Sequence, residues 1–381
     1  MSTHDLYTLP ADHETWDVAN TGYSRFTWEY DNGRDRLLRL YQKGKDKQWD
    51  QVTRIDWDIE VDPDDILGFP HETSPLFGSE IWDKMTPEQH NELGRHQVAW
   101  QFSNFLHGEQ GAMICSARIV ESVPNLDAKF YAATQTMDEA RHAEIYSRFL
   151  KEKVGLFYPI NDQLKALLDD TLSDSRWDMP YLGMQVLIEG LALAAFGVMR
   201  DLTDMPLPKQ ILAYVMQDEA RHVAFGRLAL RDYYKELTQA ERDEREEFVV
   251  EGCYLMRDRI NGRDVYEHLG LPVERCLELN EHSEYYTAFR NLLFTRIVPT
   301  VKDIGLWGPR VQKAYEDMGV LNYAASNVED LMKADEDLAE RLDREKRFAA
   351  EEAARAADVD ATIAAGEQGQ RFAQSFEHPP A

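Results

Sequence analysis

The sequence has few cysteines. Among 381 residues only Cys115, Cys253 and Cys276 occur, far apart and odd in number. This pattern indicates neither a disulfide framework nor a thiolate metal site. The N-terminal stretch MSTHDLYTLP also lacks a basic region followed by an apolar run, so we expect no secretory signal. Both absences favour a protein of the reducing cytoplasm.

Basic residues are also scarce. The chain has 42 Lys and Arg against 69 Asp and Glu, which gives a formal net charge of -27. Such a surface repels phosphate backbones and anionic membranes. We therefore expect no nucleic-acid partner.

Only one stretch is long and apolar enough to resemble a membrane span. Residues 181–199 read YLGMQVLIEGLALAAFGVM, in which Gln185 and Glu189 are the only strongly polar residues. A carboxylate near the centre of a bilayer is costly. A helix that is apolar nearly all round is also expected inside a large soluble bundle. We predict no membrane insertion, and the buried Glu189 then needs an explanation.

No segment of any length shows the alternating pattern of a strand, whereas helical periodicity dominates from about residue 86. Thr86 and Pro87 are typical of a helix start. The fold class predicted is mainly α. Helices are expected over 86–122, 125–153, 161–173, 177–202, 208–237, 239–261, 281–298 and 326–356.

The composition and the helical pattern divide the chain into four parts. We expect a mostly irregular N-terminal segment packed on a helical bundle, the bundle itself, additional C-terminal helices and a loose tail. Their ranges are 1–85, 86–237, 238–365 and 366–381.

An internal repeat carries the chemistry. The pentapeptide Asp-Glu-Ala-Arg-His at 138–142 recurs unchanged at 218–222, 80 residues later. A glutamate lies thirty residues before the Glu of each copy, Glu109 before the first and Glu189 before the second. The repeat is therefore predicted to be a helical hairpin, with one Glu on its first helix and Glu-x-x-His on its second.

Residues three apart lie on the same face of a helix, so a Glu and a His at that spacing can bind one ion together. A single Glu-x-x-His is usually a solvated pair, but two identical copies, each with an upstream Glu, indicate a di-metal site within a four-helix bundle. Two divalent ions would balance four ionised glutamates. Iron or manganese suits these ligand types, and zinc is not excluded. The ligands predicted are Glu109, Glu139, His142, Glu189, Glu219 and His222.

The repeat also supplies neighbours for these ligands. A ligating histidine usually donates its other ring N–H to a carboxylate. Asp138 and Asp218 each precede a Glu ligand and could reach the opposite histidine. We expect Arg141 and Arg221 to balance their charge.

With these motifs the chain resembles the ferritin-like carboxylate di-iron superfamily over about residues 86–237. Gly108-Glu109 and the Asp-Glu-x-Arg-His form are similar to the hydroxylase α subunits of bacterial multicomponent monooxygenases, which are di-iron oxygenases. Residues 139–146 are similar to ligand-binding oxidases related to the ribonucleotide reductase small subunit. The resemblance implies a ferritin-like four-helix bundle with flanking helices and two Fe ions, with Mn/Fe as the alternative.

The function implied is that of an oxidoreductase. The resemblance indicates an oxygenase or oxidase that uses O2, a small organic substrate and an outside electron donor, either a protein or another reductant. A homodimer is compatible with it. The alternatives are a radical-generating subunit, a ferroxidase or iron-storage protein, and a scaffold with structural metals.

Three positions depart from the patterns of these relatives. The p-aminobenzoate N-oxygenases have an additional His ligand where this chain has Val215, which argues against a close kinship in mechanism. The multicomponent hydroxylases have a Thr where this chain has Leu193, and the oxidases have a cross-linking Tyr where it has Met184.

Tyr146 lies four residues after His142, where the reductase small subunit has its radical tyrosine. It is either a redox-active phenol or an ordinary buried aromatic with a hydrogen-bonded hydroxyl, and we favour the second interpretation. His107 is expected to face away from the site.

Small residues follow Glu189 along the apolar helix. Gly190, Ala192, Ala194 and Ala195 either leave room for a substrate or only let helices pack closely. The sequence does not distinguish the two readings.

Overall fold

The structure is a computed structural model that describes residues 3–8, 16–31, 33–335, 337–338, 340–341 and 344. Residues Met1–Met332 form one compact unit, which holds the elements discussed below, and Lys333–Ala381 form another. The helix predicted over 326–356 extends beyond the described residues, and the tail predicted over 366–381 lies outside them.

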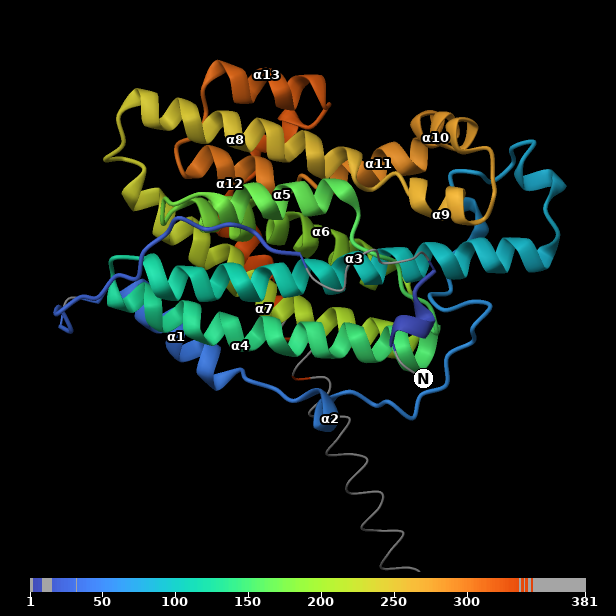
Figure 1. Ribbon diagram of the computed structural model, residues 1–381, viewed down its shortest axis with the longest axis horizontal. Helices are drawn as coiled ribbons and strands as arrows, with labels where there is room; N and C mark the ends of the chain where they lie inside the picture. Colours follow the sequence, from blue (N-terminus) through green and yellow to red (C-terminus); the bar gives the residue numbers. More distant parts are fainter. Residues whose placement is uncertain are drawn as a thin grey trace, which may run out of the picture. The chain divides into compact units, whose positions relative to one another are not determined.

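Four long helices build a bundle, as predicted. They are α3 (Pro87–Ser122), α4 (Leu126–Phe149), α6 (Glu189–Leu202) and α7 (Pro206–Tyr233). Helix α3 packs along α4, α6 packs along α7, and α4 also contacts α7 (Figure 1). The described residues form no named strand, only an isolated bridge between Tyr7 and Phe157. The mainly α fold is confirmed.

Helix α3 starts where the sequence predicts. Thr86 accepts a hydrogen bond from the backbone N–H of Gln89, and the Gln89 side chain accepts one from the N–H of Thr86. Together with Pro87 in the first turn, this capping box satisfies backbone donors that a helix start leaves free.

Shorter helices flank the bundle. Helix α1 (Asp35–Asp46) packs on α4 and α7, and α5 (Asp162–Ser173) packs on α3. The remaining α-helices are α2 (Gln51–Arg54), α8 (Gln239–Asp258), α9 (Arg263–His268), α10 (Val273–His282), α11 (Glu284–Leu292), α12 (Ile297–Asp303) and α13 (Pro309–Asp317). Short 3-10 helices cover Thr3–Leu6, His71–Thr73, Trp82–Lys84 and Leu321–Ala325.

The single helix predicted over 281–298 was wrong. The chain there forms α11, which ends at Leu292, and α12, which begins at Ile297. Pro299 has no N–H to donate and tolerates only the first turn of a helix. A new helix therefore begins just before it.

The apolar helix predicted over 177–202 is also wound differently from expectation. Tyr181–Ile188 form a π-helix, and α6 continues from Glu189. A second π-helix, Leu150–Val154, follows α4 and ends at Gly155, whose φ of 71° suits glycine. π-helical turns occur often at functional sites because they change the direction in which side chains point. The first of them immediately precedes Glu189.

This apolar segment belongs to the protein interior. Tyr181–Leu202 is long and apolar enough to cross a membrane, yet 78% of its most apolar window is buried inside the protein. Most of this helix is therefore buried among the other helices of the bundle.

The core consists of two apolar clusters. One contains Tyr131, Leu187 and Phe225, and the other contains Phe102, Tyr146 and Phe196. On α3 and α4 the two clusters are separated along the helix by the stretch that carries the predicted ligands. A polar layer thus crosses the middle of the bundle between two apolar layers.

Candidate metal centre

The six predicted ligands converge in this polar layer. Helix α3 supplies Glu109, α4 supplies Glu139 and His142, α6 supplies Glu189, and α7 supplies Glu219 and His222. All six residues are buried, and none is more than 6% exposed. They form two groups whose ligand atoms lie within 4.8 Å of one another.

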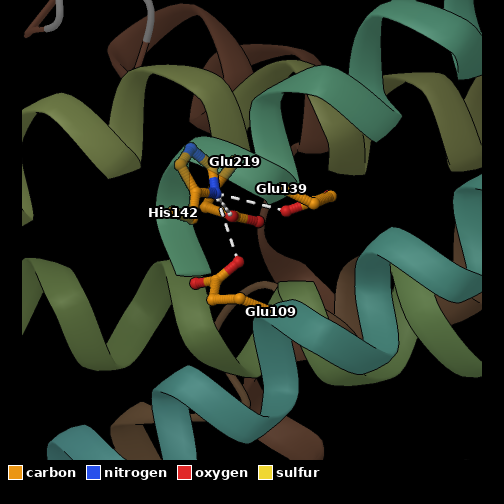
Figure 2. A group of neighbouring side chains, drawn as sticks. All are labelled: Glu109, Glu139, His142 and Glu219. Carbon is orange, nitrogen blue, oxygen red and sulfur yellow. Dashed lines mark hydrogen bonds and ion pairs between the residues drawn. The ribbon is translucent and has the colours of Figure 1, made fainter. Parts of the chain in front are cut away.

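The first group gathers three carboxylates around His142 (Figure 2). Its Nδ1 lies 3.2 Å from Glu109 Oε2, 3.2 Å from Glu139 Oε2 and 3.2 Å from Glu219 Oε1. One imidazole nitrogen and three carboxylate oxygens from three helices therefore point at one small volume. This donor set suits a divalent ion.

The second group contains Glu139, Glu189 and His222. His222 Nδ1 lies 3.1 Å from Glu139 Oε1 and 3.6 Å from Glu219 Oε2. Glu139 and Glu219 thus each place one oxygen near His142 and the other near His222. If two ions are bound, Glu139 and Glu219 would lie between them, and Glu109 and Glu189 would each hold one ion.

The Asp of each pentapeptide contacts the histidine of the other copy. His142 Nε2 lies 3.1 Å from Asp218 Oδ2, and His222 Nε2 lies 3.3 Å from Asp138 Oδ2. Nε2 is occupied on both rings, so Nδ1 is left free for a metal. This is the cross-bundle contact expected from the repeat.

The repeat arginines neutralise these aspartates. Arg141 lies 2.5 Å from Asp138 and 3.0 Å from Asp218, and Arg221 pairs with Asp218. Although burial opposes the charge of Asp218, Arg221 and His142 hold its pKa below the usual range. Two arginines thus balance two aspartates, which leaves the four glutamates to be balanced by two divalent ions.

Residues that the sequence reasoning missed complete this layer. Gln48 donates to Asp138 at 2.7 Å, and the Trp49 indole donates to Asp218 at 2.8 Å. Both come from the turn that follows α1, outside the repeat. Gln135 on α4 donates to Glu139 at 2.9 Å and to Glu189 at 2.8 Å. Gln135 lies four residues before Glu139 and therefore on the same helix face, and this spacing could have predicted the contact.

Unpaired polar atoms among the six predicted ligands show that these residues suit a pair of metal ions. Within the described part of the chain, Glu189 Oε2, Glu219 Oε2 and His222 Nδ1 are buried and make no hydrogen bond. Buried polar atoms are nearly always paired, so such orphans need a partner. Three of them at one place would find partners in bound metal ions, so the residues fit a dinuclear metal site.

The cluster carries protons when no metal balances it. Burial and the neighbouring carboxylates raise the pKa of Glu109 and of Glu189 well above the ordinary value. Burial opposes the charge of the two histidines, but the carboxylates around them raise the pKa of His142 and His222. This is the expected behaviour of a site built for cations.

Two further residues were singled out from the sequence. Tyr146 lies in an aromatic cluster with Phe102 and Phe105, and its hydroxyl is buried without a hydrogen-bond partner in the described residues. Our expectation of a hydrogen-bonded hydroxyl was therefore wrong. His107 contacts the carbonyl of Tyr158 at 2.9 Å and is directed away from the ligands, as expected.

The three positions at which the chain differs from the patterns of its relatives all have buried apolar side chains. Val215 and Met184 are fully buried, and Leu193 is 2% exposed. None offers a ligand atom or a hydroxyl. The structure therefore brings six ligand residues together.

The comparisons with known proteins agree with this architecture. The family model described as P-aminobenzoate N-oxygenase AurF matches residues 31–305, more than two thirds of the chain. The chain belongs to this family. Its members are di-iron oxidoreductases of the ferritin-like superfamily. Membership confirms the superfamily and the class of activity that the resemblance implies. The chain belongs to this family although it has Val215 where the N-oxygenases have an additional histidine, and the expected difference in mechanism stays a prediction.

Solved structures of R2-like ligand-binding oxidases are also similar. One with an aerobically reconstituted Mn/Fe cofactor has 17% identity and a TM-score of 0.43, and the alignment covers 72% of this chain and 94% of that chain. A single-residue variant with an anaerobically reconstituted Mn/Fe cofactor has 18% identity and a TM-score of 0.44, with 74% and 95% covered. No curated protein matches the sequence.

The protein is therefore an O2-using di-iron oxygenase or oxidase that acts on a small organic substrate. The buried Glu and His cluster fits its dinuclear cofactor.

Proposed function

We propose that this protein N-oxygenates a small aromatic amine, and that Glu109, Glu139, His142, Glu189, Glu219 and His222 bind its two iron ions. The observation that carries the ligand assignment is the convergence of these six buried side chains on two adjoining volumes. The family description supplies the reaction class, since it names an N-oxygenase of p-aminobenzoate.

Each group of residues has its own task. Glu139 and Glu219 would bridge the two ions, and Glu109 and Glu189 would each bind one. Asp138 and Asp218 are positioning residues, because they hold the histidine rings with Nδ1 toward the ions. The apolar layers on either side keep bulk water from the centre.

When bound, a reduced iron pair supplies electrons for the activation of O2. Conversion of an amine to a hydroxylamine inserts one oxygen atom between N and H and reduces the other to water. The balance requires two electrons and two protons, so the proposal includes an outside donor that provides the electrons. Mn/Fe is the alternative metal pair.

The site proposed here has six ligand residues rather than seven. A valine cannot bind a metal, and Val215 occupies the position of the additional histidine implied by the resemblance. By the 80-residue repeat, Val215 corresponds to Gln135, which contacts Glu139 and Glu189. We propose that Gln135 supports the carboxylates from the opposite helix instead.

A cytoplasmic location and assembly as a homodimer complete the proposal. The three cysteines are all free and buried, which suits a reducing compartment. A homodimer is tested by the mass of the purified protein in solution.

The decisive experiment combines metal analysis with absorption spectra of the anaerobic ferrous protein before and after O2. Two irons per chain, a new absorption band after O2, and hydroxylamine formation from an added aromatic amine in the presence of a reductant are expected. The Glu139→Ala variant should lose the band. A variant that kept both irons and the band would refute the ligand assignment, and failure to oxidise any amine would refute the reaction.

A further inference from the structure

Two cavities share part of their lining on one side of the bundle. The larger has a volume of about 190 Å³ and reaches the surface at the exposed residues Asp64, Asp65 and His71. The smaller has a volume of about 50 Å³ and lies between α3, α6, α11 and the residues that follow α8. They share the wall formed by Trp100, Gln101, Met199, Ile260 and Phe289. Along α3 and α6 the smaller cavity lies nearer to the predicted ligands than the larger one.

The inner cavity borders the helices that hold the two end ligands. Phe105 lines it one helical turn before Glu109 on α3, and Leu191 lines it two residues after Glu189 on α6. Ala195 lines it as well, so one of the small residues after Glu189 does leave space. Gly190 serves close packing instead, because a Cβ there would lie 3.2 Å from Ile297.

Arg259 is the charged residue in the wall of the inner cavity. It is only 7% exposed, and its Nη1 is buried without a hydrogen-bond partner in the described residues. No carboxylate compensates it: burial alone lowers the pKa of Arg259, to about 10, and the group stays cationic at neutral pH.

The other buried arginines behave differently. In the described part of the chain six more are buried, and every one of them lies within salt-bridge distance of an Asp or Glu. They are Arg118, Arg141, Arg200, Arg221, Arg227 and Arg245. A buried cation without a partner is costly, and folded proteins almost always pair it. Arg259 is thus an anion site that the rest of the described chain does not fill.

We propose that Arg259 binds the carboxylate of a single-ring substrate, whose reactive end extends past Phe105 toward Glu109 and Glu189. The inference rests on the proposed function, and it adds the residue that selects the substrate. A guanidinium offers two parallel N–H donors that match a planar carboxylate. A cavity of about 150 Å³ is large enough for benzene, so the inner cavity of about 50 Å³ would have to open into the outer one of about 190 Å³ at their shared wall to hold one substituted ring.

The test compares an acid with its neutral analogue. The dissociation constants of 4-aminobenzoate and 4-aminobenzamide are measured by calorimetric titration of the iron-loaded protein without reductant, so that no turnover occurs. The two probes have the same ring and amine, but only the acid carries a charge. We expect the unaltered protein to bind the acid roughly ten- to a hundredfold more tightly, the range for a hydrogen bond to a charged group.

The variant Arg259→Gln should lose this preference and bind acid and amide equally. The control is Arg263→Gln. It removes the same charge four residues away, from a partly exposed side chain that pairs with Glu267 and Glu274. It should keep the preference of the unaltered protein. Because Arg259 has no partner to lose, Arg259→Gln should melt no lower than the unaltered protein. Arg245→Gln, which strands Asp178, should melt at a lower temperature.

Equal affinity for acid and amide in the unaltered protein would overturn the inference, and this result does not depend on whether the variant folds. A preference for the acid that survives in Arg259→Gln would also overturn it. Neither result would contradict the proposed reaction, because that reaction has its own assay. The assay measures the oxidation of a neutral aromatic amine by the unaltered enzyme and by Arg259→Gln. Loss of all oxidation with a retained acid preference would instead refute the reaction and leave the Arg259 site standing.

Discussion

Asp218 on α7 holds His142 on α4, with 3.1 Å between Oδ2 and Nε2, and Asp138 on α4 holds His222 on α7 in the same way. Each pentapeptide therefore contributes to both halves of the centre. Its Glu and His face the metal volume, while its Asp fixes the imidazole of the other copy. The two copies of the repeat interlock, so neither hairpin can form the centre alone.

The first prediction concerns this contact. Asp218→Asn keeps the size of the side chain but removes its charge, so His142 is less firmly held and less basic. We expect the affinity for Fe²⁺ to fall roughly ten- to a hundredfold, as for other residues that orient metal ligands. Asp232→Asn, at an exposed position on the same helix, is the matched control and should bind iron normally. Affinity is measured by competition with a chelator, and an unchanged value for Asp218→Asn would contradict the orienting role.

The second prediction separates bridging from terminal ligands. Glu139 belongs to both ligand groups, whereas Glu189 belongs to one. Glu139→Gln should therefore reduce occupancy of both ions, and Glu189→Gln should chiefly reduce the one near His222. The iron content per chain, measured after dialysis, should be near zero in the first variant and near one in the second. Equal losses in the two variants would show that Glu139 does not bridge.

Much of this centre could be predicted from the sequence. The 80-residue repeat and the three-residue spacing specify which side chains share a helix face, and buried helices bring those faces together. The six ligands and the cross-contacts of Asp138 and Asp218 follow from local periodicity. Periodicity does not specify which carboxylate oxygen lies near which histidine, and only the packed helices show that Glu219 lies between His142 and His222.

The residues that escaped prediction lie outside the repeat or have no charge. Trp49 reaches Asp218 from a turn 169 positions earlier in the chain, and such a contact depends on tertiary packing alone. Gln135 is a polar residue among apolar neighbours. Its amide is not a usual ligand of a carboxylate-bridged di-metal site, so the sequence pattern did not predict a role for it. Arg259 is unusual only because it lacks a partner, and a missing contact is invisible until the packed structure is known.

The third prediction concerns protons. Because burial and the neighbouring carboxylates raise the pKa values of Glu109 and Glu189, and the carboxylates raise those of His142 and His222, the metal-free cluster keeps its protons to a higher pH than the free side chains would. A metal needs the deprotonated ligands, so binding must release protons and must weaken as the pH falls. Release is measured with an indicator dye in weak buffer on addition of Fe²⁺ under anaerobic conditions. Binding without proton release would contradict the protonation of the metal-free cluster.

The fourth prediction concerns Tyr146. A buried hydroxyl without a partner destabilises the fold by about 1–3 kcal/mol, so Tyr146→Phe should leave the melting temperature unchanged or raise it. Iron content and amine oxidation should also persist, because the ring keeps its contacts with Phe102 and Phe196. Electron paramagnetic resonance after O2 addition tests the alternative. A tyrosyl radical signal that disappears in Tyr146→Phe would favour a radical-generating function.

The fifth prediction uses a histidine away from the metal centre. Burial, together with the nearby His268 and Arg95, lowers the pKa of His96 to about 4, while an unfolded histidine titrates near 6.5. Between these values the unfolded state binds a proton that the folded state does not. The stabilisation is therefore complete above pH 6.5 and decreases as the pH falls toward 4.

In His96→Gln this contribution to the pH dependence should vanish. Urea denaturation of the metal-free proteins at pH 7 and pH 4.5 would then show a smaller loss of unfolding free energy for the variant than for the unaltered chain. The exposed His282, changed to Gln, is the control and should leave the pH dependence as it is. If His96→Gln and the unaltered protein lost equal stability over this interval, His96 would have to be protonated in the folded state, although its Nδ1 lies 2.7 Å from the Tyr158 hydroxyl in a buried position. A hydroxyl can accept from a charged imidazole as well as donate to a neutral one, so the denaturation curves decide which of the two forms the fold selects.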